Sequence, residues 1–203
     1  MRKYLIAASL VTATIATAHA TQQAAPAPAA EAVKSGSYAL DKSHVKIVWG
    51  VSHMGFSTYY GEFTDFDAQL TLDGANPENS KLNVTIDVDS VDTHDDALDG
   101  HLKKADFFDV EKFPKATFTS TKVERTGPTT ATVTGDLNLH GVTKPVTLAV
   151  TLNKAADGPM TKIYTAGFSA EGTIDRTQFG MNTYAPALGS DVKLLISGEF
   201  NLK

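Results

Sequence analysis

The stretch ATVTGDLNLHGVTKPVTLAVTLN, residues 131–153, decides the fold class of this 203-residue chain. Apolar and small residues alternate with polar residues in two runs: Val133, Gly135, Leu137, Leu139 and then Val146, Leu148, Val150, Leu152. A period of two is typical of half-buried β-strands. Gly141 lies at the bend between the runs, and Pro145 is expected to open the second strand, where a missing N–H is tolerated. The stretch therefore predicts two neighbouring antiparallel strands.

The same alternation recurs along most of the chain, for example in KLNVTIDVDSV (81–91) and FTDFDAQLTL (63–72). We expect about eight strands, at 44–51, 62–72, 81–91, 115–124, 130–139, 145–153, 162–173 and 191–202. Short connections favour antiparallel pairing, and such a set of strands forms either a sandwich or a closed barrel. The alternation places these side chains inside: Leu82, Val84, Ile86, Leu137, Leu139, Leu148, Val150, Leu194 and Ile196. Val48 and Trp49 compete for the inside of the first strand.

Two segments break the alternation. In the first, Thr93 with Asp96 resembles a capping box, and we expect a short helix from about 95 to 105, between the third and fourth strands. The second, IDRTQFGMNTYAPALGSD (174–191), is a long irregular connection. Long connections in compact domains are often functional, so function is expected at these two places.

The stretch ADFFDVEKFPKATF (105–118) holds four phenylalanines beside the expected helix. Phe107 and Phe108 leave the helix, Pro114 holds Phe113 extended, and Phe118 starts the next strand. Aromatic side chains in such numbers either plug one end of a core or border a cavity. The sequence leaves both interpretations open.

The N-terminal residues MRKYLIAASLVTATIATAHA (1–20) have the features of a secretory signal peptide: two basic residues, an uncharged run and a final A-x-A. We expect export and cleavage after Ala20. Residues 21–35 are rich in Ala and Pro and predict a disordered linker, followed by one folded domain at 36–203. No membrane-spanning segment is expected in the mature chain.

Composition excludes several classes of function. The absence of cysteine excludes disulfides, thiol catalysis and cysteine-ligated metals. The net charge is −5, and removal of residues 1–20 takes away Arg2 and Lys3 and no acid, which leaves −7. Such a chain without a basic cluster is poorly suited to nucleic acid and to broad contact with anionic lipid surfaces.

Motifs for catalysis and metal binding are also missing. The five histidines after the signal peptide (His44, His53, His94, His101 and His140) have none of the spacings of zinc sites, so no metal site is expected. No G-x-S-x-G elbow and no Gly-rich phosphate loop occurs. Arg176, in the long connection, either holds that loop together or meets an anionic head group.

Four segments in order carry a resemblance: SYALDKSHVKIVWGVSHMGFSTYYGEF, HLKKADFFDVEKFPKATFTS, GDLNLHGVTKPVTL and IDRTQFGM. Together they resemble the YceI-like family, the polyisoprenoid-binding proteins of the bacterial periplasm. The resemblance implies an all-β fold: an extended, lipocalin-like antiparallel barrel of about eight strands. It also implies an interior that holds a long isoprenoid chain, such as a polyprenyl phosphate or a quinone tail.

With that resemblance, the chain is expected to be a periplasmic binding or carrier protein and not an enzyme, with a lipid as ligand and no cofactor. The side chains expected to line the lipid cavity are Trp49, Phe66, Leu82, Val84, Ile86, Leu98, Leu102, Phe107, Phe108, Phe113, Phe118, Leu137, Leu148, Phe168 and Leu194. The expected head-group contacts are His53, His101 and Arg176. An exposed edge or the mouth could pair two copies in a homodimer. The alternatives are a stress-related structural protein with a filled barrel and an enzyme acting at the barrel mouth.

Overall fold

The computed structural model of the chain describes residues 33–203. The expected signal peptide and its cleavage site lie outside the described residues, as does most of the expected linker. The last linker residues contact the folded domain: Tyr38 Oη donates a hydrogen bond to the carbonyl of Lys34 (2.6 Å), and the N–H of Gly74 donates to Ser35 Oγ (2.9 Å).

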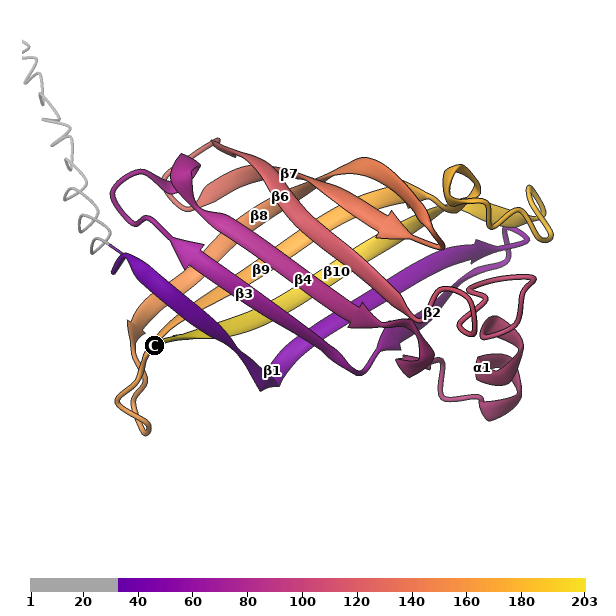
Figure 1. Cartoon of the computed structure of the whole chain (residues 1–203), viewed down its shortest axis with the longest axis horizontal. Coiled ribbons are helices and arrows are strands. Elements are labelled where there is room, and N and C mark those ends of the chain that lie inside the picture. Colours follow the sequence, from indigo (N-terminus) through magenta and orange to yellow (C-terminus); the bar gives the residue numbers. More distant parts are fainter. Residues whose placement is uncertain (1–32) are drawn as a thin grey trace, which may run out of the picture. The chain divides into compact units, whose positions relative to one another are not determined.

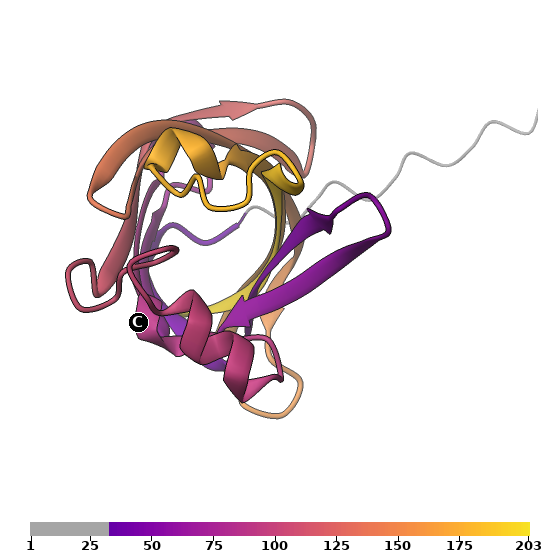
Figure 2. The same cartoon turned by 90° about the vertical axis from the view of Figure 1, so that its right-hand side faces the viewer.

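Eight antiparallel strands close into a barrel (Figure 1). In chain order the ring strands are β1 (Gly36–His53), β3 (Phe66–Leu72), β4 (Lys81–Asp87), β6 (Lys115–Arg125), β7 (Thr130–Leu139), β8 (Val142–Asp157), β9 (Tyr164–Asp175) and β10 (Leu188–Leu202). Pairing of β1 with β10 completes the ring, seen end-on in Figure 2. The expected all-β, eight-stranded antiparallel barrel with one short helix is confirmed.

Two further strands were not predicted: β2 (Ser57–Phe63) and the two-residue β5 (Val91–Asp92). They arise because β1 changes partner along its length, pairing first with β3 and then with β2. The change occurs at a bulge. Leu40 pairs with Phe200 and Val45 with Gly198, so residues 41–44 all lie opposite Glu199 of β10. A bulge bends its strand and increases the local twist, and here the β1–β2 hairpin splays away from the ring (Figure 2).

Several expected boundaries are wrong. The strand expected at 81–91 ends at Asp87 and continues as a 3-10 turn, η2 (Val88–Ser90). The 62–72 run is β2 and β3 with a break at residues 64–65, and a second turn, η1 (Pro77–Asn79), precedes β4. Pro145 does not open β8 but pairs inside it with Asp136. It is tolerated there because β9 pairs with β8 only from Ala149 onward, which leaves one side of Pro145 without a strand partner.

The helix α1 (Asp96–Leu102) is shorter than expected, and its cap is different. Asp95 is the N-cap, because its carboxylate accepts hydrogen bonds from the N–H groups of Ala97 and Leu98. Thr93 instead donates its N–H and its hydroxyl to Asp99 Oδ1. The predicted Thr93–Asp96 capping box is therefore wrong, and Thr93 ties the preceding chain to the first turns of the helix.

Three apolar clusters fill the barrel from one end to the other. Tyr38, Leu70 and Phe200 belong to the cluster farthest from α1, Phe118 and Leu137 to the middle one, and Trp49 and Phe107 to the cluster beside α1. All nine side chains predicted to face inward belong to the middle cluster or pack against it. In β1, Trp49 and not Val48 is the buried residue. Among the described residues no helix is both long and apolar enough to span a membrane.

Candidate functional site

An apolar cavity of about 100 Å³ lies inside the barrel at the end covered by α1. It is lined by β1, β2, the segment after α1, β7, β9, η3 (Arg176–Phe179) and β10. The lining residues are Trp49, Val51, Phe63, Phe107, Phe108, Leu139, Ile174, Arg176, Met181, Leu188, Val192 and Leu194. Figure 2 views the barrel from this end, with α1 and the loop after β9 around the opening.

The wall of the cavity beside α1 is made by side chains and not by a strand ladder. Of the described residues, none pairs as a strand with Ser57–Gly61 on the side away from β1, since β5 reaches only Glu62 and Phe63. The segment from α1 to Pro114 covers this part of the barrel. The rings of Phe63 and Phe108 meet edge to face with centroids 5.6 Å apart, and Leu98 and Leu102 pack in the cluster that contains Trp49.

The three phenylalanines after the helix have different roles. Phe107 and Phe108 line the cavity. Phe113 does not line it. The Phe113 ring lies 4.6 Å from the His140 ring and occupies the space beside Gly141, where a Cβ would overlap it. Phe113 therefore fixes the segment against the β7–β8 turn from outside the cavity.

The surface that the cavity exposes is entirely apolar, although Arg176 stands in its wall. Only 5% of Arg176 is exposed. Its guanidinium donates hydrogen bonds to the carbonyls of Gly189 (2.9 Å), Met181 (2.6 Å) and Leu188 (2.9 Å). Burial lowers the pKa of Arg176 from its ordinary value, while the charge of Asp175 opposes that shift. Of the two expected roles, these contacts are those of a residue that holds the loop.

Trp49 contributes the largest ring to the cavity. It packs over Gly61, its cross-strand neighbour, and a Cβ at position 61 would overlap the indole. The indole N–H is buried and has no hydrogen-bond partner in the described part of the chain, and the same holds for His140 Nε2. His140 Nδ1, in contrast, lies 3.0 Å from the carbonyl of Phe179, which links the β7–β8 turn to η3.

Beyond this cavity, the barrel interior carries apolar side chains that are only partly buried. Val84 illustrates this, because its ladder neighbours Ala68 and Phe118 are both buried while Val84 retains exposed surface. The inward side chains in this state are Leu82, Val84, Ile86, Val150, Val192, Leu194 and Ile196. These inward-facing residues are therefore packed less completely than the buried residues of the clusters.

The remaining expected site residues are distributed along the barrel. Phe118, Leu137 and Leu148 are buried in the middle cluster, and Phe168 packs against Phe200 at the far end with centroids 6.1 Å apart. Phe66 is buried beside the β1 bulge and does not contact the α1-end cavity. His53 is exposed at the end of β1, and His101 packs edge to face on Phe107 at 5.0 Å.

Sequence reasoning missed part of the cavity lining: Val51, Phe63, Ile174, Met181, Leu188 and Val192. The strand residues carried a usable signal, because Val51 follows Trp49 by two positions and Val192 precedes Leu194 by two. Met181 and Leu188 lie in and at the end of an irregular connection, where no period marks the inward side.

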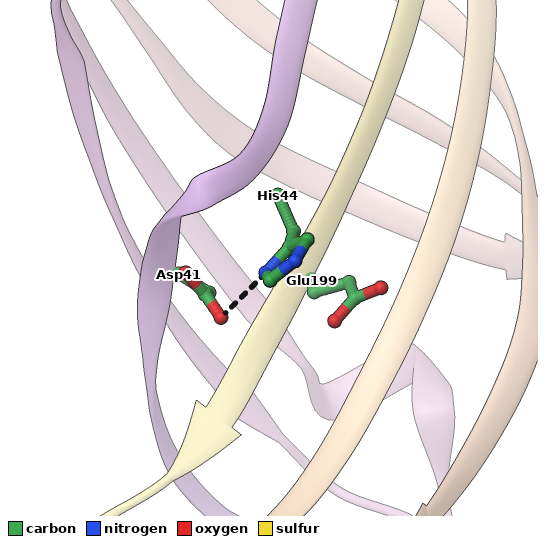
Figure 3. Close-up of side chains that lie close together, drawn as sticks. All are labelled: Asp41, His44 and Glu199. Atoms are coloured by element: carbon green, nitrogen blue, oxygen red, sulfur yellow. Dashed lines mark hydrogen bonds and ion pairs between the residues drawn. The ribbon is translucent and has the colours of Figure 1, made fainter. Parts of the chain in front are cut away.

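A separate polar cluster lies at the β1 bulge, where Asp41, His44 and Glu199 come together (Figure 3). Their potential ligand atoms all lie within 4.8 Å of one another, and His44 Nδ1 is 3.0 Å from Asp41 Oδ2. Hydrogen bonds from Ser43 and His44 lower the pKa of Asp41 to about 2, and the same bond to Asp41 raises the pKa of His44. His44 and Glu199 are exposed, so the cluster is a solvated ion pair held by the bulge.

Comparisons with known proteins agree with this architecture. Residues 38–200 match the family described as "YceI-like domain". "Protein YceI" of Salmonella arizonae is 43% identical over 167 residues, which are 81% of this chain and 86% of the relative.

Solved structures show the same barrel. BcnA of Burkholderia cenocepacia superposes with a TM-score of 0.72 at 25% identity, covering 79% of this chain and 98% of BcnA. A polyisoprenoid binding domain from Saccharophagus degradans has a TM-score of 0.60 at 15% identity, covering 82% of this chain and 98% of that domain, which is a likeness of fold alone. The family match spans nearly all of the described residues and the identity to the Salmonella relative extends over 81% of the chain, so this chain belongs to the YceI-like family.

Proposed function

We propose that this protein is an exported, periplasmic binding protein that shields a long apolar chain, of the polyisoprenoid or quinone-tail type, inside its barrel. The observation that carries the proposal is the continuous apolar interior. A cavity with a wholly apolar surface at the α1 end adjoins partly buried side chains along the lumen. The Saccharophagus protein that shares this fold is a polyisoprenoid binding domain, which supports the same ligand class here.

The chemistry of the interior favours a chain over a polar substrate. Each buried CH₂ contributes about 0.8 kcal/mol, so a tail of several isoprene units gains affinity without any directional contact. The cavity alone is smaller than an engineered cavity of about 150 Å³ that holds one benzene, so the chain must also occupy the space beside Val84, Leu194 and Ile196. Binding then requires rotamer changes along the lumen and no change in the ring of strands.

The interior also favours binding over catalysis. The cavity surface offers a ligand no acid, base or nucleophile, and Arg176 uses three donors on backbone carbonyls. A polar head group would therefore remain outside the cavity, at the mouth, where His53 and His101 are the nearest of the expected contacts. The exported location rests on residues 1–20 of the sequence.

Lipid content of the purified protein tests the proposal. The protein is prepared without detergent, extracted into organic solvent and analysed by mass spectrometry, and a near-stoichiometric isoprenoid or other long-chain lipid is expected. Leu194→Trp should lower that content, because it adds bulk inside the lumen. Leu195→Trp is the matched control, since the next side chain along β10 is exposed on the outer face. An empty wild-type barrel, or equal lipid content in both variants, would favour the filled-barrel alternative.

A further inference from the structure

Three of the exposed large apolar side chains lie on two adjacent segments at one end of the barrel, while Met160 and Ile163 lie at the other end. We define the rim as residues 53–57, the β1–β2 turn, together with residues 181–187, the loop after η3. Phe56 is 88% exposed, Tyr184 62% and Met54 57%. The two segments lie side by side, because the N–H of Met54 donates to the carbonyl of Ala187 (3.1 Å) and His53 pairs with Leu188. The rim lies at the right-hand end of Figure 1.

The rim is continuous with the cavity. The ring of Tyr184 lies 6.2 Å from the ring of Phe107, which lines the cavity, and Thr183 Oγ1 donates to the carbonyl of Asp106 (2.6 Å). Tyr184 of the rim therefore lies next to a ring that lines the cavity.

The charge of the rim differs from that of the rest of the chain. The chain has 23 acidic residues, yet none occurs from 42 to 61 and none from 176 to 190, the two stretches that contain the rim. The other side of the mouth is acidic, because α1 and its N-cap carry Asp95, Asp96 and Asp99. A surface of anionic and zwitterionic phospholipids repels carboxylates and accepts exposed aromatic side chains at its interface. The two rim segments carry exposed Met54, Phe56 and Tyr184 and no carboxylate of their own, with Asp106 beside Thr183 as the neighbouring acid. The α1 side carries three carboxylates.

We propose that the rim docks the barrel mouth on the surface of a phospholipid bilayer, with Phe56 and Met54 inserted at the interface and α1 tilted away from it. The backbone of the β1–β2 turn holds these side chains in an exposed position. Met54 has a left-handed φ of 53°, uncommon for a residue with a side chain, and Phe56 N–H closes the turn on the carbonyl of His53 (3.0 Å). The docking adds a partner to the proposed function but does not depend on it, since it is measured whether or not the barrel carries a lipid.

Vesicle flotation of the mature protein tests the docking, with vesicles of phosphatidylethanolamine and phosphatidylglycerol. The wild type should float with the vesicles, and the Met54→Ser, Phe56→Ser double variant should bind about tenfold more weakly or worse, because each lost side chain withdraws several carbons from the interface. Met160→Ser is the matched control. Met160 is 90% exposed at the opposite end of the barrel, in the β8–β9 connection, and its loss should leave flotation unchanged.

Melting curves should be alike for all variants, since the substituted side chains are exposed. The proposal is overturned if the wild type does not bind vesicles, or if the rim variant and the Met160 variant bind equally. A third outcome also overturns it: the wild type does not bind vesicles, forms a dimer in solution, and becomes a monomer when the rim is substituted. The rim would then be an interface between two copies. Lipid content, measured on the same samples, separates a failure of docking from a failure of the proposed cargo.

Discussion

Trp49 and Gly61 face each other across the β1–β2 ladder, and the indole occupies the space that a side chain at position 61 would need. The pair explains how the largest ring of the chain fits into a barrel wall. Without a side chain at 61, the ring lies against the β2 backbone and also lines the cavity. The shape of the cavity beside α1 therefore depends on a residue that contributes no side chain to it.

Gly61→Ala should destabilise the protein by about 1–3 kcal/mol, because the new methyl group overpacks against Trp49. Urea denaturation of the variant and the wild type measures the difference. Gly100→Ala is the matched control, since a Cβ at this α1 position meets nothing within 4 Å, and alanine there should stabilise by about 0.5–1 kcal/mol. Equal effects of the two substitutions would show that Trp49 is not held against Gly61.

Arg176→Met should lower the free energy of unfolding by about 2–4 kcal/mol, because one buried and two partly buried carbonyls lose their donors at once. Arg176→Lys should recover only part of the loss, since an ammonium group cannot reach all three acceptors in the geometry of a guanidinium. Thermal and urea melts measure both. A head-group role would give the opposite pattern, with stability retained and a bound anionic lipid lost.

Phe107→Ala and Phe108→Ala should each reduce lipid content, because both rings line the cavity. Phe113→Ala should reduce stability and leave lipid content unchanged, because that ring packs on His140 and Gly141 outside the cavity. Loss of a buried ring typically costs about 3–5 kcal/mol, which melting of the lipid-free proteins can resolve. If all three variants keep their lipid, the phenylalanines are a plug.

The stabilisation that the Asp41–His44 pair provides should fall at both low and high pH. The pKa of Asp41 is lowered from 3.8 to about 2, so its contribution to stability is present above about pH 4 and is lost as the pH falls toward 2. The pKa of His44 is raised above 6.5, so its contribution is present below that value and is lost as the pH rises through the raised pKa. The pair is therefore strongest between about pH 4 and 6.5.

NMR titration of the His44 imidazole measures this coupling. Asp41→Asn should lower the pKa of His44, because it removes both the charge and the charged hydrogen-bond acceptor. Glu199→Gln should lower it less, since Glu199 acts on His44 through its charge alone. A His44 pKa that neither substitution moves would exclude the arrangement in Figure 3.

The ring of strands could be predicted because each strand buries one face, which leaves a period of two in the sequence. Leu82, Leu148 and Ile196 face inward for that reason. The bulge could not be predicted in the same way. Residues 41–44 are all polar and interrupt the period, so the first strand was expected to begin at 44, whereas it begins at Gly36 and passes through the bulge.

The candidate site was predicted only in part, both on its strands and on its irregular segments. Trp49, Phe108 and Leu194 were expected and line the cavity. Met181 was missed, and the role of Arg176 was left open, because its three acceptors are backbone carbonyls whose positions depend on how residues 181–189 fold. Phe113 packs on His140, which is distant in sequence, and the sequence gives no sign of that contact.

The side-chain wall beside α1 has a kinetic consequence. Most neighbouring strands of the barrel are joined by backbone ladders, but between β2 and the segment after α1 the closure rests on side-chain contacts such as Phe63 with Phe108. Local opening of a region held by few side chains requires far less free energy than global unfolding. The rate at which a bound chain enters or leaves would therefore be governed by the detachment of α1 and its following segment, while the rest of the barrel remains intact.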